Sequence, residues 1–155
     1  MKYYKLILNV RNPKGFWGKM MIRSMNKGHY GVTGWGLNHI DIEEEFTILD
    51  VGCGGGKTVS RLSKAAVKGK VYGIDYSQLA VKKSKKFNKK AIKRNQVQID
   101  EGSVSKLPYK DNMFDLVTAV ETYYFWPDKI NDLKEIYRVL KPKGKLLLVF
   151  EMCKN

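Results

Sequence analysis

The sequence predicts an α/β domain in which a parallel β-sheet is covered by helices on both faces. After residue 46, short apolar runs alternate with segments of helical periodicity. The runs are nearly continuous in apolar residues, which is typical of strands buried on both faces. A glycine-rich turn follows the first run. Ligands of such folds lie beyond the carboxyl ends of the strands, so this turn marks the expected site.

Five strands and three helices are expected in this part of the chain. The strands are expected at residues 47–51, 71–75, 97–99, 114–120 and 145–151. The helices are expected at residues 57–67, 77–94 and 127–140, with Ser77 as a cap and Pro127 in a first turn. Their apolar periodicity predicts inward-facing side chains, among them Phe87 in the second helix and Ile130, Leu133, Tyr137 and Leu140 in the third.

The first 46 residues are expected to cover the ligand end of the domain, and residues 47–155 to form the ligand-binding unit. Asn12 and Pro13 are typical of a helix start, and Gly28 of the residue after a helix end. Residues 29–36 are rich in glycine and aromatic residues, which predicts a loop.

Composition places the chain among single-domain globular proteins. Its 155 residues fit one core, no apolar run is long enough to span a bilayer, and no signal peptide is evident. Two cysteines, Cys53 and Cys153, indicate no disulfide framework, so a reduced, cytoplasmic setting is expected. The net charge is +14, and residues 82–94 carry many lysines and no acid. We interpret this run as a solvated helix face; a nucleic-acid partner is possible but not favoured, because arginine reads phosphates better than lysine.

The strongest chemical signal is the turn at residues 52–56, where glycines allow positive φ angles and close approach of a ligand. A phosphate-binding loop has the same geometry. However, Asp50 lies two residues before the first glycine and would repel a phosphate but attract an ammonium group. Asp75 ends the next strand, where a carboxylate receives ribose hydroxyls. A ligand with a ribose, a positive amino acid end and no phosphate is S-adenosylmethionine, whose demethylated product is S-adenosylhomocysteine.

Four motifs resemble those of the Rossmann-like, class I S-adenosylmethionine-dependent methyltransferases, close to the group that includes ubiquinone and menaquinone biosynthesis enzymes. They lie at residues 49–56, 73–77, 107–115 and 138–144, in the family's order and spacing. The resemblance implies a doubly wound sheet in the order 3-2-1-4-5. Members of the family usually continue into a helix and an antiparallel hairpin. This chain stops four residues after Glu151, so a fold without the hairpin is expected.

The resemblance also implies the cofactor contacts. Asp50 and the loop would hold the methionine end, Asp75 the ribose, and Tyr76 one adenine face. Ser103 stands where the family usually has an acid, which leaves the Val104 backbone to meet the adenine. The full implied set is Asp50, Gly52, Cys53, Gly54, Asp75, Tyr76, Ser103, Val104 and Glu121. No metal is expected.

The segment after the fourth strand is where the family's methyl group meets its acceptor. Methyl transfer from a sulfonium needs in-line placement and exclusion of water more than acid–base chemistry. Aromatic residues are therefore expected to line the pocket, although packing against the last helix explains any one of them as well. These are Phe16, Trp17, Tyr30, Trp35, Tyr123, Tyr124, Phe125 and Trp126. No catalytic residue is assigned; the candidates are Glu121, His29, His39 and Tyr123.

The function expected is methyl transfer to a small or lipid-like acceptor. An RNA or protein methyltransferase is one alternative, motivated by the charge; against it, residues 121–124 lack the prolines usual in amino-directed nucleic-acid enzymes. A truncated cofactor-binding module without catalysis is another. The fifth strand would have an open edge and one bare face, which predicts a homodimer through that strand.

Overall fold

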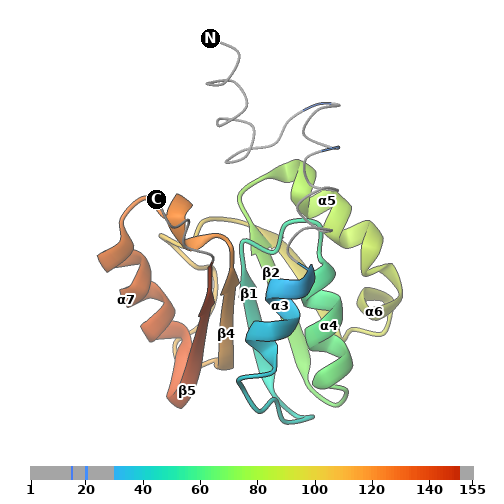
Figure 1. Cartoon of the computed structure of the whole chain (residues 1–155), viewed down its shortest axis with the longest axis horizontal. Coiled ribbons are helices and arrows are strands. Elements are labelled where there is room, and N and C mark those ends of the chain that lie inside the picture. The colour runs from blue at the N-terminus through green and yellow to red at the C-terminus, as the bar shows by residue number, and fades with distance from the viewer. Residues whose placement is uncertain (1–14, 16–19, 21–29, 151–155) are drawn as a thin grey trace.

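A five-stranded sheet forms the centre of the computed structural model, which describes Gly15, Met20 and residues 30–150 (Figure 1). The strands are β1 (Thr47–Val51), β2 (Lys70–Asp75), β3 (Val97–Glu101), β4 (Phe114–Val120) and β5 (Leu140–Val149). The helices are α3 (Tyr30–Leu37), α4 (Lys57–Ala65), α5 (Gln78–Phe87), α6 (Lys89–Lys93) and α7 (Lys129–Val139), with a 3-10 turn η1 (Tyr123–Phe125).

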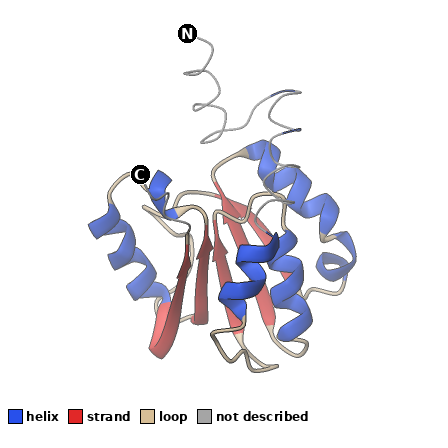
Figure 2. Ribbon diagram, in the orientation of Figure 1, coloured by secondary structure: helices blue, strands red, loops and turns tan. Residues whose placement is uncertain are grey.

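The strands are all parallel and lie in the order β3-β2-β1-β4-β5 (Figure 2). This confirms the predicted order. In the centre of the sheet, Leu49 of β1 lies between Tyr72 of β2 and Val117 of β4. The chain changes direction across the sheet between β1 and β4, and ligands of doubly wound folds bind beyond that point.

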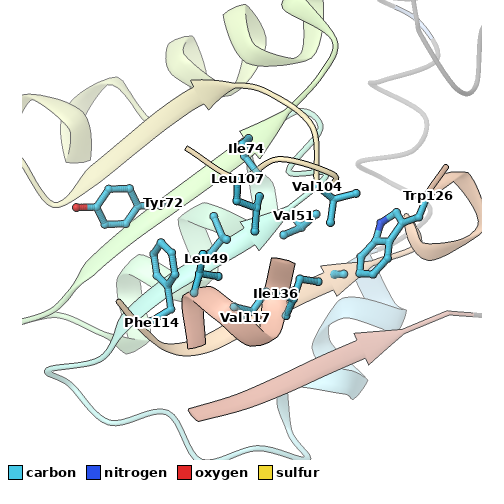
Figure 3. Close-up of a cluster of buried hydrophobic side chains, with 12 residues drawn as sticks. Leu49, Val51, Tyr72, Ile74, Val104, Leu107, Phe114, Val117, Trp126 and Ile136 are labelled. Carbon is cyan, nitrogen blue, oxygen red and sulfur yellow. The ribbon is translucent and has the colours of Figure 1, made fainter. Parts of the chain in front are cut away.

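Two apolar clusters cover the two faces of the sheet, because alternate residues of a strand point to opposite faces. Leu49 packs into one cluster, with Ile136 of α7 and the buried Trp126 (Figure 3). Ile48, the residue before it, packs into the other cluster with Val59 of α4. Figure 1 shows the corresponding layers, with α7 on one side of the sheet and α4, α5 and α6 on the other. The prediction of a parallel sheet covered on both faces is confirmed.

The predicted inward face of the last helix is wrong for two of its four residues, whereas Leu133 and Leu140 pack against the first apolar cluster as predicted. Ile130 and Tyr137 are 71% and 82% exposed, whereas Ile136 and Val139 are buried. The helix begins after Asp128, whose Oδ1 accepts the N–H of Asn131, and Pro127 lies outside it. The side of the helix that packs against the sheet is therefore shifted from the predicted one toward Ile136 and Val139.

The long basic helix is broken in two at Asn88. The Asn88 Nδ2 group donates hydrogen bonds to the carbonyl oxygens of Gly56 and Ser84, both at 3.0 Å. These bonds fix the Asn88 side chain between α5 and the glycine loop. The helix direction changes at this residue, and Phe87, predicted to be buried, is 53% exposed.

Residues 30–36, predicted as part of a loop, instead lie within the α-helix α3. Its glycines permit close packing: a Cβ on Gly36 would overlap the Val149 side chain of β5. Leu37 packs with Leu147 on the second apolar cluster. The face of β5 that was expected to be bare is therefore partly covered by α3. The cover over the site was expected from residues 1–46. Of these, residues 1–29 lie outside the described residues except for Gly15 and Met20, so the cover stays a prediction.

β5 is the edge strand of the described sheet and pairs there with β4 alone. Association of two copies through this edge stays a prediction. Among the described residues, no helix has the length and apolar character required to cross a membrane.

The glycines of α3 allow a test of this packing. We expect Gly36→Ala to lower the free energy of unfolding by about 1–3 kcal/mol, because the new methyl group meets the buried Val149. Gly31→Ala in the same helix is the control: its Cβ meets nothing within 4 Å, so the higher helix propensity of alanine should be neutral or stabilise by up to about 1 kcal/mol. Urea unfolding of both variants measures the difference, and equal effects would contradict the close contact between α3 and β5.

Candidate cofactor site

The loop between β1 and α4 is held in a glycine-specific conformation. Gly52, Gly54 and Gly56 have φ angles of +71°, +51° and +82°. The N–H groups of Gly52 and Cys53 both donate to the Ile74 carbonyl oxygen of β2, at 2.8 and 3.0 Å. A side chain at Gly52 would overlap Thr122, which follows β4. The loop therefore lies against both neighbours of β1 and leaves little room for any residue but glycine.

Asp75 connects the end of β2 to this loop. Its Oδ2 accepts the N–H of Gly54 at 2.9 Å, and its Oδ1 accepts the N–H of Ser77 at 2.9 Å. Burial raises the pKa of the Asp75 carboxyl, while these two hydrogen bonds lower it. Each carboxylate oxygen has a second lone pair, so both retain capacity to accept a hydroxyl. The predicted cap of α5 is also present: Ser77 Oγ accepts the N–H of Ala80 at 3.4 Å.

Asp50 is a buried acid in the middle of the sheet. Its Oδ1 accepts a hydrogen bond from Thr118 Oγ1 of β4 at 2.7 Å. Burial raises the pKa of the Asp50 carboxyl to about 7, against the lowering effect of the Thr118 bond, and the negative charge of Asp75 raises it further. A cation bound nearby would favour the ionised form of this group.

The residues implied for the adenine surround the end of β2. Tyr76 is exposed directly after Asp75. The N–H of Gly102 donates to the Asp75 carbonyl oxygen at 3.1 Å, which fixes the segment that carries Ser103 and Val104 beside it. The Val104 side chain points into the first apolar cluster (Figure 3). Its backbone is therefore the part that can meet a ligand.

Glu121, at the end of β4, has an unusual backbone conformation. Its φ angle is +56°, which is uncommon for a residue other than glycine and is frequent at functional sites. Its N–H donates to the Val149 carbonyl oxygen at 2.8 Å. The Tyr124 hydroxyl donates to Glu121 Oε2 at 3.3 Å. The sequence analysis included Glu121 among the candidate residues, but no sequence pattern predicts its positive φ angle. This angle occurs directly after the last pair of residues between β4 and β5.

Three aromatic side chains gather beyond β4 and β5. The rings of Tyr123 and Phe150 stack with centroids 5.9 Å apart, and Tyr124 meets Phe150 edge-on at 5.9 Å. Tyr124 and Phe150 are 43% and 40% exposed, so both present surface to solvent. The sequence analysis did not place Phe150 among the pocket residues, because in the sequence Phe150 is only one of the last residues of an apolar strand.

The other described aromatic residues of the predicted pocket lie around this group or apart from it. Trp126 is buried in the core, in edge contact with Tyr123 at 5.2 Å. Trp35 is exposed on α3 and packs on His39, whose Nδ1 lies 2.7 Å from the Trp35 carbonyl oxygen. Phe125 contacts Tyr124 edge-on at 6.1 Å. Phe16, Trp17, His29 and the Tyr30 side chain lie outside the described residues.

This arrangement suits a ligand with a cationic end and vicinal hydroxyls. Acids stand on β1 and at the end of the adjacent β2, with the glycine loop between them. The half-exposed aromatic rings lie on the β4 side of the same loop. The residues therefore fit S-adenosylmethionine, in which an ammonium group, a sulfonium and a ribose follow one another.

Comparisons with known proteins agree with this fit. Residues 49–148 match the family model described as a methyltransferase domain. The demethylmenaquinone methyltransferase of Oceanobacillus iheyensis is 36% identical over 73% of this chain and 48% of its own length. The cycloartenol-C-24-methyltransferase 1 of Oryza sativa subsp. japonica is 32% identical over 74% of this chain and 33% of its own length.

Among solved structures, a SAM-dependent methyltransferase from Aquifex aeolicus is similar with a TM-score of 0.70 and 28% identity, over 78% of this chain and 66% of that one. The chain spans about half or less of the length of the two curated relatives described above. The family model nevertheless covers most of the sheet and the whole glycine loop. The chain thus belongs to the Rossmann-like, S-adenosylmethionine-dependent methyltransferase family.

Proposed function

We propose that this domain binds S-adenosylmethionine and transfers its methyl group in line to a small or lipid-like acceptor. The observation that carries the proposal is the direct contact between the glycine loop and the segment after β4. Thr122 lies so close to Gly52 that a Cβ there would overlap it, and Thr122 Oγ1 donates to the Val51 carbonyl oxygen at 3.2 Å. The glycine loop and the segment that leads to Tyr123 and Tyr124 are therefore in direct contact.

In this proposal the residues at the ends of β1, β2, β3 and β4 hold the cofactor. Asp50 and the backbone of Gly52, Cys53 and Gly54 meet its methionine end, and Asp75 accepts its ribose hydroxyls. Tyr76, Ser103 and Val104 flank its adenine, and Glu121 borders its amino acid end. The cofactor supplies an electrophilic methyl group on a sulfonium. The loop and the carboxylates only have to orient that group and keep water away from it.

The aromatic rings of Tyr123, Tyr124 and Phe150 are proposed to receive the acceptor. Half-exposed aromatic faces attract a sulfonium cation and also bind flat or apolar molecules. The names of two relatives refer to demethylmenaquinone and cycloartenol, and both names support an acceptor of lipid-like character. Glu121 and Tyr124 share a hydrogen bond, so this pair is the proposed place where a proton of the acceptor is received.

Incubation with methyl-labelled cofactor tests the acceptor class. We expect label to appear in the organic phase when a bacterial lipid extract is supplied, and not in purified RNA or in protein. Label in RNA or protein would establish the alternative motivated by the +14 charge. Tight binding of S-adenosylhomocysteine without transfer to any fraction would establish a cofactor-binding module.

Asp75 gives a direct test of the ribose contact. We expect Asp75→Ala to weaken binding of S-adenosylhomocysteine by about 1.5–3 kcal/mol, because a charged acceptor for two hydroxyls is lost. The matched control is Glu101→Gln, since Glu101 is the register partner of Asp75 on the neighbouring strand and is exposed. Calorimetric titration measures both variants. Similar affinities for Asp75→Ala and the parent would place the ribose elsewhere.

The raised pKa of Asp50 predicts a pH dependence of cofactor binding. Below pH 7 the free protein holds a proton on this carboxyl, whereas the cationic end of the cofactor favours the ionised form. Affinity for S-adenosylhomocysteine should therefore rise roughly five- to tenfold between pH 6 and 7.5.

The pH dependence of the stability of the free domain is opposite to that of the affinity. The folded-state pKa lies above the ordinary value of 3.8, so the contribution of Asp50 to stability is lost as pH rises from about 3.8 to about 7. Asp50→Asn should flatten both profiles. A pH-independent affinity in the parent protein would contradict the role given to Asp50.

A further inference from the structure

Positive charge is concentrated on α5 and α6, and neither helix contains an acidic residue. Residues 76–99 contain eight basic side chains and no Asp or Glu. All but Lys83, which is half-buried, are exposed; the eight are Lys82, Lys83, Lys85, Lys86, Lys89, Lys90, Lys93 and Arg94. No acidic group of the described chain lies within ion-pair distance of Lys82, Lys86 or Lys89, and the ion pairs found involve Lys68, Arg138 and Lys141. We call this surface the α5–α6 basic face.

The packing of α5 and α6 against the sheet places these basic side chains on the solvent side of the helices. Ala80, Val81 and Ser84 of α5 and Ala91 of α6 are buried, which leaves the lysines on the opposite side of both helices. Figure 1 shows α5 and α6 at the outer flank of the sheet, following one another along it. The basic face thus lies on the outer side of these two helices.

An apolar side chain stands within this charged surface. Phe87 is the last residue of α5 and is 53% exposed between Lys86 and Lys89 in the chain. The break at Asn88 places it there instead of in the core. An exposed aromatic ring beside lysines suits a membrane interface, where the ring can enter the acyl boundary while the ammonium groups meet headgroups.

We propose that the α5–α6 basic face binds the surface of an anionic lipid membrane. The charge complements anionic headgroups, and each lysine close to such a surface adds to the attraction. Seven of the eight basic residues are lysines, which act as point charges, whereas arginine is the better side chain for reading phosphates and bases in a nucleic acid. Single-stranded RNA is usually held by several stacking rings, and residues 78–94 contain one aromatic side chain, the exposed Phe87.

This surface adjoins the cofactor site. α5 begins three residues after Asp75, and the exposed Tyr76 lies between the two. A domain held by the basic face would therefore keep the β2 side of its site near the bilayer. The inference does not depend on the acceptor, and it holds for the free domain whether or not methyl transfer takes place.

Vesicle flotation tests the proposal with the full chain. We expect co-flotation with vesicles of phosphatidylcholine and phosphatidylglycerol, none with pure phosphatidylcholine, and loss of binding at high salt. Neutralising three lysines in Lys82→Gln/Lys86→Gln/Lys89→Gln should lower the partition coefficient at least tenfold. The control Lys106→Gln/Lys110→Gln/Lys134→Gln removes the same charge from exposed positions on other elements and should change it by less than threefold. Equal losses in the two variants would mean attraction by net charge alone and would overturn the proposal.

Phe87→Ala separates insertion from charge attraction. We expect it to weaken partitioning by a similar factor at every salt concentration, whereas the lysine variant also reduces the dependence on salt. Binding of S-adenosylhomocysteine serves as the folding control and should match the parent in each variant, since these residues are not part of the cofactor site. Failure of that binding in the parent would refute the proposed function and leave the flotation result standing. Absence of flotation together with salt-dependent binding of single-stranded RNA would replace the membrane by a nucleic acid.

Discussion

The Asp75 carboxylate is the interaction on which the ligand end of this domain depends. One oxygen accepts the N–H of Gly54 in the glycine loop, and the other accepts the N–H of Ser77 at the start of α5. The end of β2, the loop after β1 and the helix after β2 are thus held by a single side chain. Buried N–H groups without partners are costly, so the loop conformation and the acid require each other. The same acid is the group proposed to accept the ribose.

Two buried carboxyls on adjacent strands create an unfavourable electrostatic environment in the free protein. Burial raises the pKa of both Asp50 and Asp75, and the charge of Asp75 adds to the shift of Asp50. A hydrogen bond from Thr118 offsets part of this cost. A cationic ligand would offset the rest, so the site is destabilised in a way that favours the ligand chemistry proposed for it. Ordinary packing on both faces of the sheet supplies the stability that makes such a site tolerable.

Glycine and asparagine residues determine how the helices approach the sheet. Gly36 brings α3 against Val149, and Asn88 ties the break between α5 and α6 to the glycine loop through its bond to Gly56. The second contact has a consequence at the surface, because the break exposes Phe87 among the lysines. The geometry of the cofactor loop and the character of the α5–α6 basic face are therefore structurally linked, although they serve different interactions.

The sequence by itself determined five buried strands in a parallel sheet and the positions of Asp50, the glycine loop and Asp75, because buried strands and glycine turns leave strong local patterns. The order of the strands followed from the resemblance to the methyltransferase family. Tertiary structure decided the rest. Helical periodicity allows either Ile136 or Tyr137 of α7 to face inward, and only packing against the sheet buries Ile136 and leaves Tyr137 exposed. The glycines of α3 favour a loop when the sequence is considered alone. In the structure, Gly36 allows close contact between α3 and Val149 of β5. The positive φ of Glu121 and the stacking of Phe150 on Tyr123 arise where β4 and β5 end side by side, a pairing between residues distant in the chain that no local pattern encodes.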